Sequence, residues 1–298
     1  MAYGDLVPGD GEVSYAPSCI FHHVDGSDDE VLYVNQGTKT SCEFVKLDKV
    51  PNAYGTASGT GPSPAIWNNV DVLELMLNPQ KGVYYFDDFM GQIDVTTADG
   101  WTLTQSNATG TIGPLTTDQG GVLQITSVGA LADDSINAQL TNCNVKPASG
   151  VNIYFEARVN MTDATQQFVL GLAEVDTSLM AAGVLDDVVD KVVFYHEAAS
   201  TDNKISAASS NDASEEKDAD VAANVDNTYV KLGFIIEGTS KVTYYVNGVQ
   251  VGTCEDSSDL PNEVMCLSAF CGYESAAGIM HIDWVRIAQV KSTDGGRA

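Results

Sequence analysis

The sequence predicts a mainly β protein: an antiparallel two-sheet sandwich preceded by a small N-terminal module of β and helical segments. Two observations carry this prediction. Short stretches of alternating apolar and polar residues recur from residue 84 onward, with turn residues between them, a pattern typical of antiparallel sandwiches. The different composition of the first part of the chain indicates a separate module, so the predicted domains are 1–80 and 81–298.

The N-terminal module is predicted to hold a β-hairpin and a linker. Residues 30–47 contain two short apolar runs around Gly37, which is the spacing of a hairpin. Residues 52–64 are rich in Gly, Ser, Thr and Pro, a composition typical of an exposed linker. A chain that starts at residue 84 is therefore expected to fold without this module.

A short helix is predicted to complete the module. Ser63 and Pro64 form a helix start, because Pro suits the first helical position. Asn78-Pro79 ends the helix, since the residue before Pro avoids the α region. One face of the helix is formed by apolar residues at spacings of three and four, namely Ile66, Val70, Leu73 and Leu77. A strand over residues 70–77 is the alternative.

Alternation locates the strands of the predicted sandwich. Residues 152–159 and 230–237 alternate apolar and polar side chains. Asn247-Gly248 between two apolar runs is the strongest local signal, because this pair suits both positive-φ positions of a type I′ turn. Trp284 shares its strand face with Met280 and Ile282, so we expect it in the core. Further strands are predicted at residues 84–89, 121–128, 167–175, 190–197 and 264–273, a short helix at 176–188, and a solvated loop or strand edge at 209–220.

Charge and cysteine content exclude several classes of protein. The chain has 298 residues, with 14 Lys and Arg against 41 Asp and Glu, and a net charge of −27. Nucleic acids and anionic membranes need clustered basic residues, so neither is an expected partner. The sequence has no run of 18 apolar residues and no basic N-terminal region, so neither a membrane span nor a signal peptide is predicted. The six cysteines are too sparse for a disulfide framework; we expect folding in a reducing cytosol, with Cys266 and Cys271 buried.

The sequence contains no motif of an enzyme or of a metal site. Adjacent side chains of a strand point to opposite faces, so no acidic pair supplies the two carboxylates of a glycosidase. These pairs are Asp87-Asp88, Asp133-Asp134, Asp186-Asp187 and Glu215-Glu216. His22 and His23 stand near four acidic residues but lack the ligand spacing of a calcium loop, and His196 and His281 are single strand residues. We therefore expect no catalytic, cofactor-binding or metal-binding residue, and a protein that is not an enzyme.

Aromatic residues leave a sugar-binding face open as an alternative. The candidates are Tyr154, Tyr244, Tyr245 and Trp101. Aromatic side chains also suit the pleated faces and the core of a sandwich. Most of the four are therefore expected to pack, and the sequence does not identify the binding residues.

Two groups of motifs resemble known proteins. Phe86-Asp-Asp-Phe89, Val246-Asn-Gly248 and Ile282-Asp-Trp-Val-Arg286 resemble strands of concanavalin A-like (laminin-G-like) jelly rolls, over roughly residues 84–290. Residues 67–79, leading into residues 84–91, are similar to structural proteins of tailed bacteriophages, in which a short Trp-containing helical segment precedes such a jelly roll. Only scaffold motifs match, so no site residue of either group carries over.

The second resemblance implies a structural role, because such phage proteins are often decoration (cement) proteins. It implies that the chain is made in the host cytoplasm and lies on the outer capsid surface of a virion. There it would bridge major capsid protein subunits as a homo-oligomer, a trimer, with residues 1–80 as the attachment module. The acidic charge fits this position, since packaged DNA repels it. Two alternatives stay open: a lectin-like tail or fibre protein that binds a glycan or receptor, and a polysaccharide-active β-sandwich enzyme.

Overall fold

The protein consists of two compact units, Met1–Ala53 and Tyr54–Ala298. The computed structural model describes residues 2–4, 7–23, 32–46, 59–90, 100–106, 110–115, 121–128, 134–181, 183–186, 189–197, 203–212, 214–272 and 278–291. No helix in these ranges is long and apolar enough to cross a bilayer.

The N-terminal unit is built on a four-stranded sheet. Its strands follow the chain order: β1 (Ala2–Gly4), β2 (Ile20–His23), β3 (Leu32–Asn35) and β4 (Phe44–Lys46). β3 and β4 pair antiparallel, which confirms the predicted hairpin around Gly37. The buried amide of Asn35 accepts hydrogen bonds from the backbone N–H groups of Gly37 and Glu43. This one side chain therefore fixes both ends of the hairpin turn.

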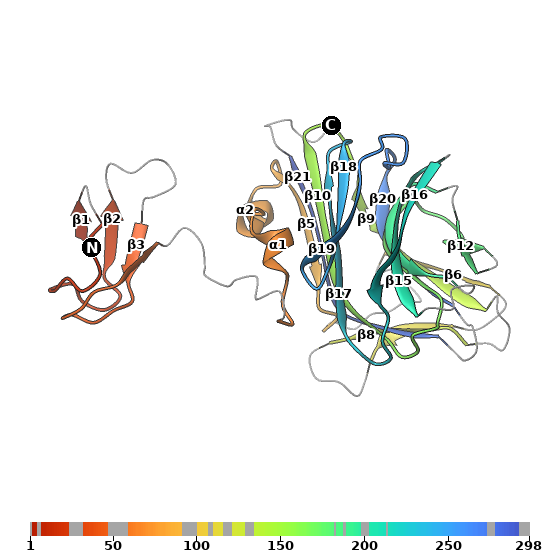
Figure 1. Ribbon diagram of the computed structural model, residues 1–298, viewed down its shortest axis with the longest axis horizontal. Coiled ribbons are helices and arrows are strands. Elements are labelled where there is room, and N and C mark those ends of the chain that lie inside the picture. The colour runs from red at the N-terminus through yellow and green to blue at the C-terminus, as the bar shows by residue number, and fades with distance from the viewer. Residues whose placement is uncertain are drawn as a thin grey trace. The chain divides into compact units, whose positions relative to one another are not determined.

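The larger unit is an antiparallel sandwich of two sheets, as the sequence predicts (Figure 1). The first sheet, here called the helix-side sheet, has the spatial order β19 (Val249–Cys254), β18 (Lys241–Val246), β17 (Val230–Glu237), β10 (Val151–Met161), β21 (Ile279–Lys291), β8 (Leu123–Thr126) and β7 (Thr111–Pro114), with β5 (Gly82–Asp87) pairing to β21. The opposite sheet has the order β16 (Ser214–Ala223), β15 (Lys204–Asn211), β14 (Lys191–His196), β11 (Phe168–Ala173), β20 (Met265–Gly272), β9 (Ser135–Val145) and β6 (Trp101–Ser106).

The core lies between the two sheets and is rich in aromatic rings. Phe155 and Phe234 stack at 4.7 Å between ring centroids, and Tyr244 meets Phe194 edge-on at 5.7 Å. All four side chains are buried. Because each comes from the inward-facing positions of an alternating strand, the period-two pattern of the sequence locates this core.

One segment differs from its predicted secondary structure, and the acidic stretch 209–220 takes the strand-edge form, one of the two expected for it. The described residues of the predicted helix 176–188 form no helix; they contain the short strands β12 (Met180–Ala181) and β13 (Val184–Leu185), with Gly183 at φ +77° between them. That positive φ favours a turn over a helix. Much of the acidic stretch 209–220 belongs to β16, which forms an edge of the opposite sheet. An edge position explains why so many charges are tolerated in a strand.

The outer face of the helix-side sheet is covered by residues 59–77, here called the strap (Figure 1). The strap contains α1 (Pro64–Trp67) and α2 (Val72–Leu77). Ile66 and Trp67 are buried against the sheet. A Cβ atom at Gly233 would lie 2.5 Å from Ile66 Cδ1. The glycine in β17 therefore leaves the space in which α1 docks.

The strap corrects two predictions. The predicted helix and residues 59–64 of the predicted linker lie in the larger unit, so the boundary falls at Ala53 and not at residue 80; residues 52–58 of that linker lie outside the described residues. The single predicted helix is two helices, because the chain breaks after Trp67 and Asp71 caps a new helix by accepting the backbone N–H of Glu74. The break rotates α2, and Leu73 and Leu77 are 66% and 75% exposed instead of sharing a buried face with Ile66.

A β-bulge corrects the expected position of Trp284. The register between β10 and β21 shifts between Arg158 and Val159, whose partners are Trp284 and Ile282. Met280 and Ile282 face the core, whereas Trp284 faces the strap and donates from Nε1 to the Thr60 carbonyl at 3.0 Å. The ring is buried at 8% exposure, but under the strap and not between the sheets.

Candidate ligand-binding site

The aromatic candidates named from the sequence serve packing. Tyr244 is fully buried between the sheets, and Trp101 packs against the same core. Tyr154 lies under the strap beside Trp67, with Tyr245 packed against this cluster. Their positions match the packing role expected for most of them, and they do not come together at a surface.

The acidic and histidine candidates are also dispersed. Asp87 accepts hydrogen bonds from Tyr85 and from the backbone of Phe89, and Glu215 forms ion pairs with Lys191 and Lys217. Asp133, Asp187 and the side chains of His22 and His23 lie outside the described residues. His196 is buried, and His281 faces Gln124. Within the described ranges, no group of three or more His, Cys, Asp and Glu is arranged to hold a metal ion.

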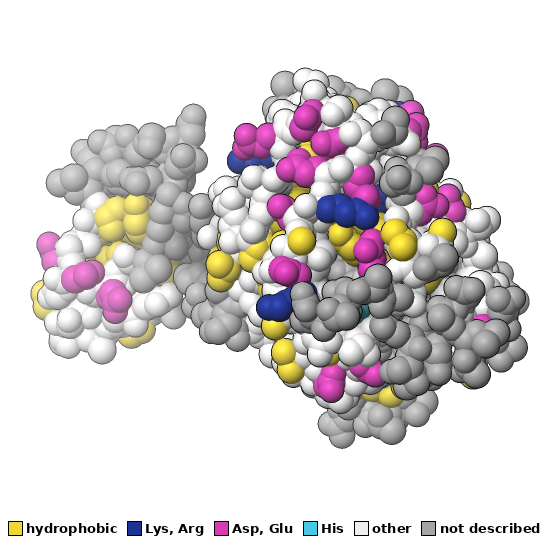
Figure 2. Space-filling model, turned by 45° about the vertical axis from the view of Figure 1, so that its right-hand side comes forward, with side chains coloured by type: hydrophobic (Ala, Val, Ile, Leu, Met, Phe, Trp, Pro, Cys, Tyr) yellow, Lys and Arg dark blue, Asp and Glu magenta, His cyan; other side chains and the backbone are white. Residues whose placement is uncertain are grey.

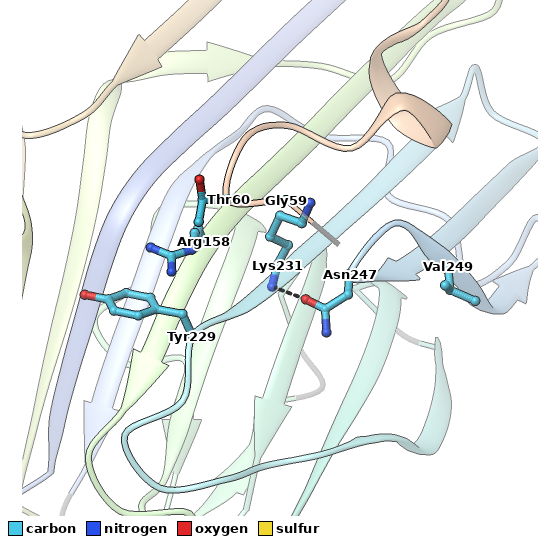
Figure 3. Close-up of a pocket in the computed structure, with 7 residues that line it drawn as sticks. All are labelled: Gly59, Thr60, Arg158, Tyr229, Lys231, Asn247 and Val249. Carbon is cyan, nitrogen blue, oxygen red and sulfur yellow. Dashed lines mark hydrogen bonds between the residues drawn. The ribbon is translucent and has the colours of Figure 1, made fainter. Parts of the chain in front are cut away.

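A pocket of about 460 Å³ opens on the outer face of the helix-side sheet. Its lining residues come from the strap, β10, β17 and the turn that joins β18 to β19 (Figure 3): Gly59, Thr60, Arg158, Tyr229, Lys231, Asn247 and Val249. Volumes of ~300–1,000 Å³ are typical of small-molecule sites. Arg158, Lys231 and Val249 belong to strands of the sheet, whereas the other lining residues lie in the strap, just before β17 and in the β18–β19 turn.

Arg158 and Tyr229 form one side of the pocket. The guanidinium carbon of Arg158 lies 4.0 Å from the centre of the Tyr229 ring (Figure 3), a cation–π contact. Arg158 also forms an ion pair of 2.5 Å with Asp283, the residue at the bulge of β21. The ion pair and the ring fix the plane of the guanidinium while other N–H groups of Arg158 remain available as donors.

Lys231 and Asn247 form the other side. The Asn247 side-chain oxygen accepts a hydrogen bond of 3.0 Å from the Lys231 backbone (Figure 3). The sequence predicts a type I′ turn here, and the φ values of +51° at Asn247 and +76° at Gly248 confirm it. The Lys231 ammonium donates to the Gly61 carbonyl at 3.0 Å. The hairpin turn and the strap are therefore both tied to β17 at the rim of the pocket.

Charges at the pocket are balanced in pairs. Arg158 is matched by Asp283, and Lys231 is attracted by Glu156, which is buried beneath the strap. Burial lowers the pKa of Lys231, and the Glu156 carboxylate opposes that shift. Burial raises the pKa of Glu156, against the opposing effect of hydrogen bonds from Ser63 and Trp67 and the charge of Lys231. Both cations of the lining thus have a carboxylate outside the lining that acts on them, an ion pair in the case of Arg158 and a charge attraction in the case of Lys231.

The pocket residues suit binding more than catalysis. Guanidinium, amide and hydroxyl groups offer both donors and acceptors to a ligand rich in hydroxyl groups. Among the described residues that line the pocket there is no carboxylate, so the pair of acids needed for glycoside hydrolysis is not assembled there.

Sequence reasoning did not select these residues. Arg158 and Lys231 occupy outward positions of two alternating strands, and this alternation was the only available signal. Their juxtaposition depends on the register of β10 against β17, in which they are direct partners. Register cannot be read from either strand alone.

Comparisons with known proteins identify the fold. No protein-family model and no curated protein sequence matches this chain. Peanut lectin, solved with a nine-residue peptide, is similar with a TM-score of 0.50 and 13% identity, covering 72% of this chain and 99% of the lectin. A β-glucanase of Bacillus licheniformis is similar at 0.46 and 10% identity (68% and 97% covered). A protein of unknown function from Shewanella oneidensis is similar at 0.45 and 17% identity (73% and 90% covered). The likeness to peanut lectin shows that the larger unit has the concanavalin A-like jelly-roll fold.

Proposed function

We propose that this chain is a non-enzymatic protein whose jelly roll binds a neutral glycan in the pocket between the strap and the β18–β19 turn. The observation that carries the proposal is the composition of the pocket: donors and acceptors from Arg158 on β10, Asn247 in the β18–β19 turn and Thr60 in the strap, with no carboxylate among the lining residues described. A sugar hydroxyl both donates and accepts hydrogen bonds, so it needs both kinds of partner.

Charge supports a neutral ligand over an acidic one. The chain has a net charge of −27, and in the face that Figure 2 shows, acidic side chains are scattered over the larger unit. An acidic polysaccharide is repelled by such a surface. The cations of the pocket offset this repulsion little, because Arg158 is paired with Asp283 and the Lys231 ammonium donates to the Gly61 carbonyl within the attraction of Glu156.

A binding assay with a blocked pocket tests the proposal. Isothermal titration calorimetry would measure the affinity of the full chain for a panel of neutral and a panel of acidic oligosaccharides. Thr60→Trp places an indole in the pocket while leaving intact the Thr60 carbonyl that Trp284 uses. We expect a neutral oligosaccharide to bind and the variant to lose at least tenfold in affinity.

The matched control is Thr111→Trp, an exposed position on β7 at the far edge of the same sheet. It should bind as the natural chain does. Binding of acidic oligosaccharides alone, no binding at millimolar concentration, or equal affinity of Thr60→Trp would each contradict the proposal.

Decoration of a bacteriophage capsid is the second candidate, and the two-unit organisation favours it. The N-terminal unit has its own sheet and is a compact body separate from the jelly roll, as an attachment module requires. The acidic charge suits the outside of a DNA-filled shell. In this role the N-terminal unit would bind major capsid protein, and many weak contacts on one shell would add up by avidity.

Rebinding to shells tests the second candidate. The full chain should rebind to capsids stripped of it, and a chain of residues 59–298 should not, although it retains the strap and the sandwich. Equal binding of both chains would remove the N-terminal unit from the attachment role. The two candidates are compatible, because one concerns the pocket and the other the first unit.

A further inference from the structure

The large exposed apolar side chains of this protein are concentrated in one helix–strand segment. Among the described residues, every exposed Leu, Met and Phe lies between residues 73 and 90; the other large exposed apolar residues are Val or Ile. The group consists of Leu73 (66% exposed), Met76 (65%), Leu77 (75%), Val83 (40%), Phe86 (44%) and Met90 (69%). Single exposed apolar residues are normal, whereas a cluster marks an interaction surface.

The structure explains why α2 presents this surface. Leu75 is the buried residue of the helix, and it packs with the apolar residues that lie between the strap and the helix-side sheet. Leu73, Met76 and Leu77 recur at spacings of three and four on the opposite side, so α2 has an apolar outer face as well as an apolar inner one. A helix that is apolar on both sides belongs between two surfaces, and the sheet supplies one of them.

The strand that follows offers a second feature of an interface. Among the strands that the structure describes, β5 pairs only with β21, so its other edge has no strand partner there. Its sequence, Gly-Val-Tyr-Tyr-Phe-Asp, contains no Lys or Pro of the kind that protects an edge. Edge strands of this type pair with another strand when one is within reach.

We propose that α2 and β5 form a two-fold interface with a second copy of this chain. A chain of net charge −27 repels its own copy, so contact between two copies has to rest on apolar area and on backbone pairing. Here Glu74 lies 4.0 Å from Lys81, and Asp71, Asp87 and Asp88 accept hydrogen bonds from backbone or side-chain donors. An antiparallel strand pair is also self-complementary, as a two-fold axis requires.

The exposed area is sufficient for a dimer. Val83 points to the other face of β5 and is not counted; with a full accessible area of ~200 Å² for each side chain, the other five exposed fractions give roughly 640 Å². A standard interface buries about 800 Å² per partner. The inference is independent of the proposed glycan site, which lies over β10 and β17.

Sedimentation velocity of the full chain over a range of concentration and salt tests the proposal. We expect a monomer–dimer equilibrium that shifts toward the dimer as salt rises, because salt screens the repulsion between two acidic chains over ~8 Å at 0.15 M. The double variant Leu73→Gln, Met76→Gln should raise the dimer dissociation constant at least tenfold. Both side chains are exposed, so the thermal midpoint of the monomer should stay unchanged.

The matched control is Val225→Gln, Val264→Gln, two exposed apolar positions outside this segment (52% and 42% exposed). It should dimerise as the natural chain does. A monomer under all conditions, a dimer unaffected by the α2 variant, or a trimer would overturn the proposal. Binding of the monomer to neutral phosphatidylcholine vesicles, lost in the α2 variant, would also overturn it in favour of a lipid occupant.

Discussion

The Glu156 carboxylate accepts a hydrogen bond of 2.8 Å from the indole Nε1 of Trp67, although the two residues are 89 positions apart in the sequence. The same oxygen accepts the backbone N–H of Ser63 at 2.9 Å. Glu156 is fully buried on β10, so this oxygen anchors the strap to the sheet. The contact joins the two parts of the chain that frame the pocket.

The buried carboxylate of Glu156 should make the stability of the docked strap depend on pH. Burial raises its pKa above the ordinary value of 4.5, so the folded protein binds a proton more readily than the unfolded chain does. Stability from this group therefore falls as pH rises from about 4.5 through the raised pKa. In thermal unfolding, the stability of Glu156→Gln relative to the natural chain should increase as pH rises over that interval, because Gln keeps a hydrogen-bond acceptor but carries no charge.

Glu156→Ala is the contrasting variant. It leaves the Ser63 and Trp67 N–H groups without their acceptor, which should cost about 1–3 kcal/mol at neutral pH. If the stability difference between Glu156→Gln and the natural chain did not change with pH, the buried carboxylate would not be the titrating group.

Gly233 should be intolerant of any side chain. A Cβ atom there would meet Ile66 Cδ1 at 2.5 Å and the Phe155 carbonyl at 2.8 Å. Gly233→Ala should destabilise the larger unit by about 1–3 kcal/mol through displacement of α1. Gly113→Ala on β7 is the control, because nothing lies within 4 Å of its Cβ position. Equal midpoints in chemical denaturation would show that α1 does not need this space.

Trp284 and Gly248 should differ in the scale of their effects. Trp284→Ala removes a buried ring and its hydrogen bond to Thr60, which should cost about 3 kcal/mol. Gly248→Val forces a branched residue to φ +76°, which should cost about 1–2 kcal/mol in one hairpin. Thermal unfolding compares the two; a lower midpoint for Gly248→Val would mean that the environment of Trp284 is misassigned.

The strap should be required for a stable jelly roll. A chain of residues 59–298 should unfold at the temperature of the larger unit in the full protein, because it keeps the strap. A chain of residues 84–298 lacks Ile66 and Trp67, whose burial contributes about 1.5–3 kcal/mol each. Its midpoint should be several degrees lower. Equal midpoints for the two chains would show that the strap adds nothing to the stability of the sandwich.

Local chemistry in the sequence determined much of this fold. The Asn247-Gly248 turn follows from the positive φ that both positions need, and the core positions of β10 and β17 follow from strict alternation. Ser63-Pro64 marked the start of α1 for the same kind of reason, a preference of one residue for one backbone conformation. Such features depend on residues that are adjacent in the sequence, so the sequence alone predicts them.

Tertiary structure alone decided the features that depend on register and docking. One bulge after Arg158 turned Trp284 from the core to the strap, since a shift of one residue reverses the face of a strand. Similarly, the break before Asp71 starts a new helix whose faces are rotated relative to α1, so Leu73 points outward. The pocket forms because Arg158 and Lys231 are direct partners on neighbouring strands, and because the Gly61 carbonyl accepts a hydrogen bond from the Lys231 ammonium. These contacts join residues far apart in sequence, and their formation depends on how the sheets pair and how the strap docks.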